Sequence, residues 1–399
     1  MGPVSRMLPS DEAARRLGVK VSTLYAYVSR GLVVSHPEPG GRRSLFDLSD
    51  IERLAHRQRG GPRPETRLAT ITTGITQLRA GGPFYRGVAA PELARRGTRF
   101  EDVAALLWQC APAGAWPAPE LGPCPLTSVA DRMRWAVVMC GATDPQRADL
   151  RPEALTVAAG RVTAALTDVV RSTDDAGRAP SGGASVGSIG SRLARALVPG
   201  AAPSGALTRA VTAALVLMAD HELATSTLAV RVAASTRADL YDALAAGLAT
   251  LAGPLHGGAS RQAYQMLVDA EREGAAGAVT EMLRGGRRLP GFGHSIYKDS
   301  DPRFDALMAQ IGPLLDEERL SLVLGVLELA RAHDVPVPNC DLALAALSWG
   351  MRMSPDAGRM IFTVARVAGW TAHYMEELTE RPLRFRARAL YNVEPTASP

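Results

Sequence analysis

The feature that most constrains the fold is a long stretch, residues 204–258, in which alanine, leucine and small residues follow one another almost without a break. Hydrophobic residues make up 46% of the chain, but aromatic residues only 5%. Alanine and leucine are strong helix formers, whereas aromatic residues are enriched in strands. The sequence therefore predicts an all-α fold, in which small side chains let helices pack closely and leave room for a ligand.

Length and charge predict more than one domain. A chain of 399 residues exceeds what one small core needs, which favours two or three domains. The net charge is +5, and residues 1–64 alone hold eleven Arg or Lys against six Asp or Glu. The rest of the chain is therefore close to neutral. The Gly, Pro and Arg run that begins at Gly60 predicts a linker behind a basic N-terminal domain.

The four cysteines, Cys110, Cys124, Cys140 and Cys340, form no CxxC pair and no cluster with histidine. This pattern argues against a zinc site or a disulfide framework and favours a reducing cytoplasm. We find no apolar signal core and no run of about 18 apolar residues. We therefore expect a cytoplasmic protein without a membrane segment.

The N-terminal segment predicts two short helices joined by a tight turn. Ser10 is placed to cap the first helix, and Gly18 to stop it. The second helix begins near Ser22, with Leu24, Tyr25 and Val28 at helical spacing. Side chains able to contact phosphates or bases come from this helix and from the basic turn behind it, and they are Thr23, Tyr27, Arg30, Arg42 and Arg43.

This segment resembles the winged helix-turn-helix of the mercury-resistance-regulator and excisionase group, including a closing helix that begins at Leu48. The resemblance covers about fifty residues and implies contact with DNA. The alternative is a small helical cap whose arginines only solvate its surface. Both interpretations stay open at this point.

Three histidines lie where helical patterns break. His221 precedes a polar Thr-Ser-Thr run, His256 follows a proline, and His294 stands behind Gly291 and Gly293. Glycine permits a tight backbone at such a position, and an imidazole at a break can point into a cleft. For His221 and His256 taken singly, a structural role is the alternative.

Charged residues of the C-terminal half add candidates. Asp341 follows two prolines at the predicted start of a helix, where its carboxylate could bind substrate groups or simply cap backbone amides. Arg303 belongs to an Asp-Pro-Arg turn, and Arg366 lies on an otherwise apolar helical face. A buried charge is costly, so Arg366 should have an anionic partner. His373, on the same helix, is expected to pack.

Ordered along the chain, the motifs YRG, DHExxxST, GPLHGGA, GFGHxxYKxxDPR, PNxD and ARxxGWxAHxxE, followed by RxRALY, resemble citrate synthase over roughly residues 68–393. The resemblance implies a homodimer of two-domain helical subunits, in which a small domain closes over the active site. The expected organisation is a helix-turn-helix domain 1–60, a linker 61–67, a large domain 68–255 with 362–399, and a small domain 256–361.

The resemblance also assigns roles residue by residue. Asp341 takes a proton from the acetyl methyl of acetyl-CoA, His256 donates a hydrogen bond to the thioester oxygen, and His294 polarises and protonates the ketone of oxaloacetate. The residues that hold oxaloacetate carboxylates are His221, Arg303 and Arg366, with Arg386 supplied by the second subunit. No metal or other cofactor is implied.

Departures from the family pattern leave the acyl group open. Ser295 stands where an arginine is usual, Ala224 where an asparagine is usual, and the four residues after Asp341 lack the usual aromatic bulk. The first hypothesis is a citrate synthase that uses acetyl-CoA and oxaloacetate, and a close variant uses propionyl-CoA to give 2-methylcitrate. A hypothesis from another class is a DNA-binding regulator whose synthase-like body senses oxaloacetate or acyl-CoA.

Overall fold

The computed structural model describes residues 7–29, 32–38, 44–48, 50–51, 71–112, 114–170, 187–198, 202–253, 256–286 and 288–386. The chain divides into two compact units, Met1–Ile71 and Thr72–Pro399. Within the described part of the chain, every helix is too short or too polar to cross a bilayer.

The N-terminal unit combines two helices with a small antiparallel sheet. Its elements are β1 (Met7–Pro9), α1 (Ser10–Leu17), α2 (Val21–Ser29), β2 (Ser35–Pro37) and β3 (Ser44–Asp47). The strand order is β1-β3-β2, with Leu8 opposite Phe46 and Ser35 opposite the same phenylalanine. Two helices followed by an antiparallel strand pair confirm the predicted winged helix-turn-helix.

Packing in this unit follows the predicted pattern for α1 and departs from it on α2. Gly18 ends α1 at a φ of 68°, a conformation that favours glycine. The helix begins one residue earlier than a Ser10 cap would allow, with Pro9 at the cap position. On α2, Tyr25 is 41% exposed, although its ring also meets Phe46, and Tyr27 is half-buried against the unit's core.

The sequence places Tyr25 with Leu24 and Val28 at helical spacing and Tyr27 among the candidates for contact with DNA, but both rings lie at the boundary of the core. Thr23 is half-buried. Arg30, Arg42 and Arg43 lie outside the described residues, as do the predicted linker 61–67 and the closing helix beyond residue 51.

The C-terminal unit is helical apart from a small sheet of β4 (Thr76–Arg79), β5 (Gly82–Tyr85) and β6 (Val88–Ala89). Its helices are α4 (Ala90–Arg95), α5 (Phe100–Trp108), α6 (Val129–Ala142), α7 (Pro152–Val169), α8 (Ile189–Leu197), α9 (Gly205–Met218), α10 (Thr225–Ser235), α11 (Leu240–Leu251), α12 (Ala259–Arg284), α13 (Pro302–Ile311), the short 3-10 turn η2 (Gly312–Leu314), α14 (Glu317–Ala332), α15 (Cys340–Gly350) and α16 (Ala357–Leu378). The sequence did not predict the sheet, in which Tyr85 pairs with Thr76 and Val88.

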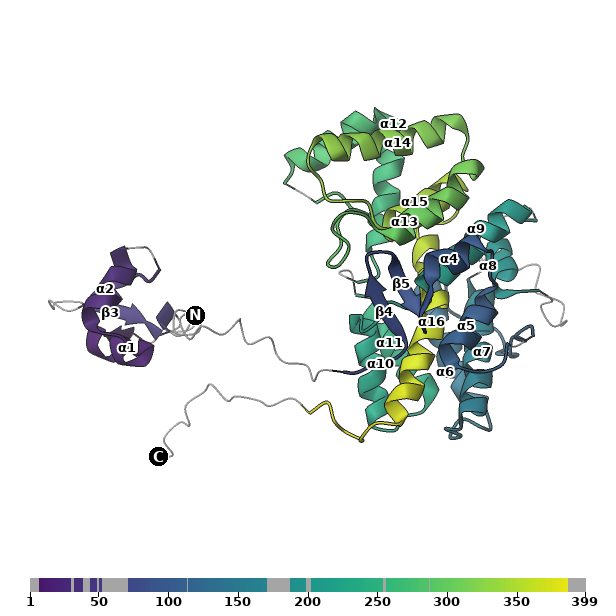
Figure 1. Ribbon diagram of the computed structural model, residues 1–399, viewed down its shortest axis with the longest axis horizontal. Coiled ribbons are helices and arrows are strands. Elements are labelled where there is room, and N and C mark those ends of the chain that lie inside the picture. The colour runs from purple at the N-terminus through teal and green to yellow at the C-terminus, as the bar shows by residue number, and fades with distance from the viewer. Residues whose placement is uncertain are drawn as a thin grey trace. The chain divides into compact units, whose positions relative to one another are not determined.

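The helices form two groups around α16 (Figure 1). Helices α12 to α15 lie together at one end of the unit, where α12 packs on α14 and α15. Helix α16 packs on α5, α7, α9, α10 and α11 of the other group and also contacts α15. Seventeen of its residues are buried, which makes it the central helix of the unit. The division into a large and a small domain at 256 and 361 stays a prediction.

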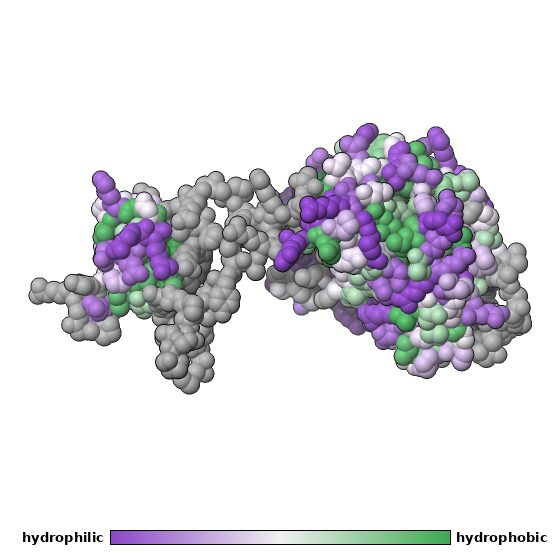
Figure 2. All heavy atoms as spheres, turned by 90° about the horizontal axis from the view of Figure 1, so that it is seen from below, coloured by the Kyte–Doolittle hydropathy of each residue, from purple (hydrophilic) through white to green (hydrophobic). Residues whose placement is uncertain are grey.

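Small residues allow these helices to approach closely, as the composition predicted. A methyl group on Gly247 of α11 would stand 2.8 Å from Val230 of α10. A methyl group on Gly160 of α7 would stand 3.0 Å from the ring of Trp116. On the face seen in Figure 2, hydrophobic residues of both units lie in patches between hydrophilic ones.

The two segments predicted as loops differ from each other. The Pro-rich segment from Cys110 is irregular where it is described, yet Trp116 is buried and stacks on Trp108 with 5.4 Å between ring centroids. It is therefore an anchored segment. The Gly- and Ser-rich segment from Ala179 lies outside the described residues up to 186, and its end is helical, because α8 begins at Ile189 with the Ser188 side chain as its cap.

Candidate active site

Most of the predicted site residues contact one of two aromatic rings. One of these rings is Tyr297. The His294 imidazole stacks on the Tyr297 ring with 4.8 Å between centroids. His221 meets both rings edge-on, at 5.2 Å from His294 and 5.9 Å from Tyr297. The guanidinium carbon of Arg303 lies 5.2 Å from the Tyr297 centroid. Residues distant in the sequence thus meet around one phenol ring, to which sequence reasoning assigned no role.

The second ring is Phe362 on α16. The guanidinium carbon of Arg366 lies 4.5 Å from its centroid, and the His256 imidazole meets it edge-on at 6.4 Å. The His256 Nε2 atom is 2.8 Å from Ser226 Oγ at the start of α10. Neither Phe362 nor Ser226 was singled out from the sequence, although Ser226 stands in the quoted Ser-Thr pair.

The backbone around His294 fixes which ring nitrogen carries the proton. Gly291 and Gly293 have φ angles of 81° and 80°, which confirms the expected tight backbone. The loop then turns so that the backbone amides of Ile296 and Tyr297 both donate to His294 Nδ1, at 3.1 and 3.2 Å. A nitrogen that accepts two N–H groups holds no proton, so Nε2 is the N–H donor that a substrate oxygen could meet.

Burial and nearby cations keep the three imidazoles neutral. Desolvation, followed by the charges of Arg303 and Arg366, holds the pKa of His221 well below its usual value. The pKa of His256 is lowered by burial and by Arg366, and that of His294 by burial and by Arg303. Neutral imidazoles can donate a hydrogen bond to a carbonyl oxygen without adding positive charge beside the arginines.

Arg366 and His221 have buried nitrogens without hydrogen-bond partners among the described residues. Arg366 is 1% exposed, and its Nε and Nη1 atoms form no hydrogen bond with any described residue. His221 Nε2 is likewise buried without a partner among the described residues. The described carboxylates form no ion pair with Arg366, and its stabilisation within the chain comes from the ring of Phe362 and the more distant charge of Asp220. Unpaired buried donors are costly, and an anion can satisfy them.

Arg303 differs from Arg366 because its guanidinium is already paired. Its Nε and Nη2 atoms donate to the two oxygens of Asp301, at 2.9 and 2.7 Å, and both side chains are buried. The predicted Asp-Pro-Arg turn is the start of α13, with Asp301 as the helix cap. Arg366 thus has unpaired N–H groups for a carboxylate, whereas Arg303 already spends Nε and Nη2 on Asp301 and keeps Nη1 for a ligand.

Asp341 is not the helix cap that the alternative interpretation required. Asn339 occupies the cap position of α15, and its side chain accepts the backbone N–H of Asp341 at 2.9 Å. The Asp341 carboxyl is therefore not the cap of this helix. Burial raises its pKa to about 6, although the charge of Arg303 opposes this and that of Asp301 adds to it. A carboxyl group with this pKa suits proton transfer near neutral pH.

The remaining residues singled out from the sequence differ in burial and surroundings. Tyr85 of the YRG motif is buried, and its hydroxyl donates to the carbonyls of Val216 and Leu217 at the end of α9. Arg386 is exposed on the segment that follows α16. Leu342, Ala343, Leu344 and Ala345, which replace the usual aromatic and small residues, are all buried in the core.

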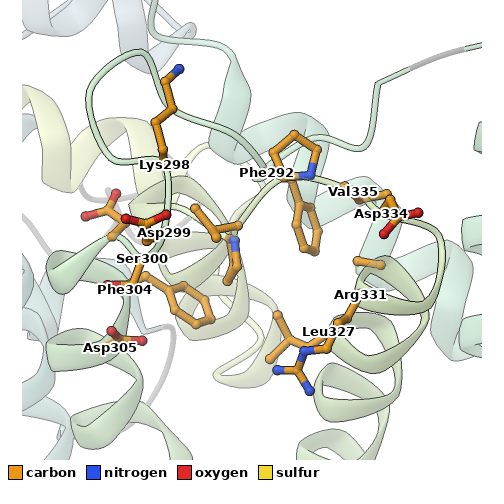
Figure 3. Close-up of a pocket in the computed structure, with 15 residues that line it drawn as sticks. Phe292, Lys298, Asp299, Ser300, Phe304, Asp305, Leu327, Arg331, Asp334 and Val335 are labelled. Atoms are coloured by element: carbon orange, nitrogen blue, oxygen red, sulfur yellow. The ribbon is translucent and has the colours of Figure 1, made fainter.

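A separate cavity of about 540 Å³ lies beside the site (Figure 3). It is bordered by α13, α14 and the two paired loops that carry Phe292 and Pro338. Four aspartates and only two cations line it, and they are Asp299, Asp301, Asp305, Asp334, Lys298 and Arg331. This excess of negative charge disfavours a phosphate-rich ligand. Of the cluster around Tyr297 and Phe362, no residue borders this cavity.

Residues 118–388 match the family described as "Citrate synthase, C-terminal domain". The chain belongs to the citrate synthase family. Residues 7–59 match a family described as "Helix-turn-helix domain". Both resemblances drawn from the sequence motifs are therefore confirmed.

Similar proteins carry two names. A citrate synthase of Dictyostelium discoideum is 36% identical over 200 residues, which cover 47% of this chain and 39% of that protein. A 2-methylcitrate synthase of Shewanella oneidensis is 34% identical over 187 residues, which cover 45% and 50%. The chain thus spans about half, or less, of the length of these curated relatives.

The fold is also that of solved citrate synthases. The chain matches the Thermoplasma acidophilum enzyme, solved as a ternary complex with carboxymethyl coenzyme A and oxaloacetate, with a TM-score of 0.67 and 23% identity. The match covers 84% of this chain and 97% of that one. No group of side chains suited to a metal ion is found among the described residues. The absence of a metal cofactor stays a prediction.

The Asp341 carboxyl should titrate near pH 6, because burial disfavours its charged form. A raised pKa means that folding binds this proton more tightly, so the contribution of Asp341 to stability is full below about pH 4 and is lost as pH rises through about 6. We expect Asp341→Asn to gain stability relative to wild type between these limits. Carbon-13 spectra of labelled aspartates measure the titration, and Asp149, whose pKa its partner Arg151 lowers to about 2, is the internal control. An Asp341 titration near pH 4 would contradict this.

Proposed function

We propose that the protein condenses an acyl-CoA with oxaloacetate and hydrolyses the product thioester to release CoA. One observation carries the proposal: Arg366 and His221 have unpaired buried nitrogens, and the rings of Tyr297 and Phe362 hold them beside His256, His294 and Arg303. The charge of Arg303 also acts on the Asp341 carboxyl. Donors without acceptors suit a dicarboxylate, and a carboxyl group with a raised pKa suits removal of a proton from carbon.

In this proposal the Asp341 carboxylate removes a proton from the methyl group of the acyl thioester. A thioester methyl is a very weak acid, so charge that develops on the thioester oxygen must be met by a placed donor. His256 is that donor. Its Nε2 atom lies beside Ser226 Oγ, which leaves Nδ1 as the nitrogen that donates to the thioester oxygen.

Oxaloacetate is held and polarised by the remaining residues. Arg366 binds one carboxylate through its unpaired guanidinium N–H groups, while Arg303 and His221 complete the binding site. His294 donates from Nε2 to the ketone oxygen, and transfers its proton there as the enol carbon attacks the ketone carbon. Water then hydrolyses the thioester. Arg386 is proposed to reach the partner subunit's oxaloacetate, in keeping with its exposed position.

Acetyl-CoA is the proposed donor, and propionyl-CoA, which gives 2-methylcitrate, is the alternative. The relative named citrate synthase supports acetyl-CoA, and the relative named 2-methylcitrate synthase supports propionyl-CoA. One methylene changes binding in a pocket by only about 1–3 kcal/mol. The buried leucines and alanines after Asp341 give no reason to favour one donor. The cytoplasmic location and the absence of any cofactor remain predictions.

Incubation with oxaloacetate and acetyl-CoA or propionyl-CoA should release CoA, which a thiol reagent detects. Asp341→Ala should lower kcat roughly 10²- to 10⁴-fold, because it removes the general base. For the wild type, kcat/KM should fall as pH drops below about 6, where Asp341 becomes protonated. Asp305→Ala, on the neighbouring helix α13 and outside the cluster, is the control. A folded wild type that releases no CoA from either donor would end this proposal.

We also propose a homodimer, supported by apolar side chains on one layer of helices. Helix α10 packs on α11, α11 on α6, and α6 on α7. On this layer Val232 is 42% exposed, Val138 59% and Val157 62%. Exposed apolar residues on successive packed helices favour association with a second copy.

Val157→Glu should shift the protein from dimer to monomer in light scattering after size-exclusion chromatography, because association would bury the new charge. It should also lower activity if the partner subunit supplies Arg386. Leu324→Glu, at a similarly exposed position of α14, is the matched control and should remain dimeric. A wild type that is monomeric at micromolar concentration would contradict the dimer.

A second candidate function is ligand-dependent binding to DNA. The helix-turn-helix match and the concentration of the basic excess in residues 1–64 favour it. A dimeric body would present two such domains to paired half-sites. In this role the cluster would sense oxaloacetate or acyl-CoA, with weak or absent catalysis.

Removal of residues 1–64 should leave the C-terminal unit folded and its activity unchanged, since this unit has its own core. Binding to duplex DNA, measured by fluorescence anisotropy, should disappear. In the full chain, the double variant Arg42→Ala, Arg43→Ala should weaken binding and reduce the salt slope by about one for each phosphate that the protein no longer neutralises. An inactive or insoluble truncation would instead indicate a structural cap.

A further inference from the structure

Behind the site, a buried chain of polar contacts connects α10, α16 and the turn that carries His221. Arg231, His373 and Asp220 are each completely buried. Arg231 Nη1 lies 2.9 Å from His373 Nδ1, and His373 Nε2 lies 3.3 Å from Asp220 Oδ2. None of the three was given a role by the motifs, and His373 was expected only to pack.

The direction of these hydrogen bonds is fixed. An arginine is always a donor, so His373 Nδ1 must accept and therefore carries no proton. The proton of the imidazole is on Nε2, where it is donated to the Asp220 carboxylate. Arg231 is itself anchored, because Nε donates to Glu377 and Nη1 to Glu376. His373 thus has one tautomer and one orientation.

The fixed position of the Asp220 carboxylate also fixes the backbone around His221. Its Oδ2 atom also accepts the backbone N–H of Glu222 at 3.0 Å, which closes a turn around His221. Glu222 has a φ of 55°, a conformation that is unfavourable for a residue with a side chain unless its surroundings hold it. The Asp220 carboxylate supplies that constraint.

Helix α16 is shaped to receive this turn. Arg366, Gly369 and His373 follow at intervals of three and four residues and so share one face. The Gly369 N–H donates to the carbonyl of Ala219 at 3.0 Å. A methyl group on Gly369 would stand 2.2 Å from Asp220 Oδ1, so only glycine lets the turn approach this closely.

We propose that His373 is a positioning residue for oxaloacetate: it holds the Asp220 carboxylate and, through the Asp220 turn, directs the His221 imidazole into the site. This proposal rests on the function proposed above for His221. The contact that matters is the one between His373 Nε2 and Asp220, and the contact with Arg231 serves to orient the ring.

Two amide variants of nearly equal polarity separate these contacts. In His373→Gln, the amide nitrogen can reach the position of Nε2 and donate to Asp220. In His373→Asn, the amide is one methylene shorter and can accept from Arg231 but cannot reach Asp220. Tyr374→Phe, which removes the buried hydrogen bond to the Ala238 carbonyl, controls for a general loss of stability on the same helix.

We expect His373→Asn to raise KM for oxaloacetate roughly tenfold or more, as removal of a charge-assisted hydrogen bond implies, with KM for the acyl-CoA changed less than about twofold. His373→Gln should stay within about threefold of wild type for both. Tyr374→Phe should lower the melting temperature without changing KM. Equal effects of Asn and Gln, the reverse order, or equal rises in both KM values would overturn the proposal.

Two measurements keep the test independent of turnover and of the folding of the variants. In wild-type protein labelled with nitrogen-15 histidine, His373 should give the signature of the Nε2–H tautomer, and an Nδ1–H tautomer would overturn the proposal. Calorimetry with oxaloacetate alone should show weaker binding to His373→Asn than to His373→Gln. The two proposals can fail separately. If the wild type and the variants bind oxaloacetate as expected but the wild type releases no CoA, the proposed reaction is refuted and the role of His373 in binding oxaloacetate remains.

Discussion

The guanidinium of Arg366 lies in the interior of the C-terminal unit, where a charge costs free energy unless its surroundings compensate for it. The described residues compensate in part, through the ring of Phe362 beneath it and the carboxylate of Asp220 at longer range. Two of its nitrogens remain without acceptors among these residues. The neutral state of His221 and His256 follows in part from the same charge, because a second cation beside Arg366 would be unfavourable.

Aromatic residues are scarce in this chain, and the site depends on two of them. The face of Tyr297 contacts the guanidinium of Arg303, and its ring also contacts the imidazoles of His221 and His294. The face of Phe362 contacts the guanidinium of Arg366, and its ring also contacts the imidazole of His256. Such contacts orient the polar rings without using their nitrogens. His294 and His256 therefore keep hydrogen-bonding capacity for a ligand, and the helices around them can be built from alanine and leucine.

The sequence predicted much of the fold because helix propensity and motif order are local properties. It predicted the helical body, the helix-turn-helix, and the tight backbone at Gly291 and Gly293. The small sheet around Tyr85 was missed because its strands are two to four residues long. Strands of this length are too short to show an alternating pattern of polar and apolar residues.

The site was predictable as a list of residues and not as an arrangement. His221, His294 and Arg303 belong to motifs, but their common contact with Tyr297 arises from tertiary packing, which spacing does not encode. The pairing of Arg303 with Asp301 and the cap formed by Asn339 were hidden for a related reason. Near the start of α15, Asn339 and Asp341 could each cap the helix, and near the start of α13, Asp301 and a ligand could each pair with Arg303. Only the three-dimensional structure shows which of them does so.

The Asp301 carboxylate has a consequence for motion. Besides binding Arg303, it accepts the backbone N–H of Cys340 at 3.3 Å, and so it joins the start of α13 to the start of α15. Asp341 is the next residue. This shared carboxylate couples the position of α13, which carries the arginine, to the segment that carries Asp341, while His221 belongs to the turn against α16. A relative motion of these two parts would change the distance between Arg303 and His221 more than the distance between Arg303 and Asp341.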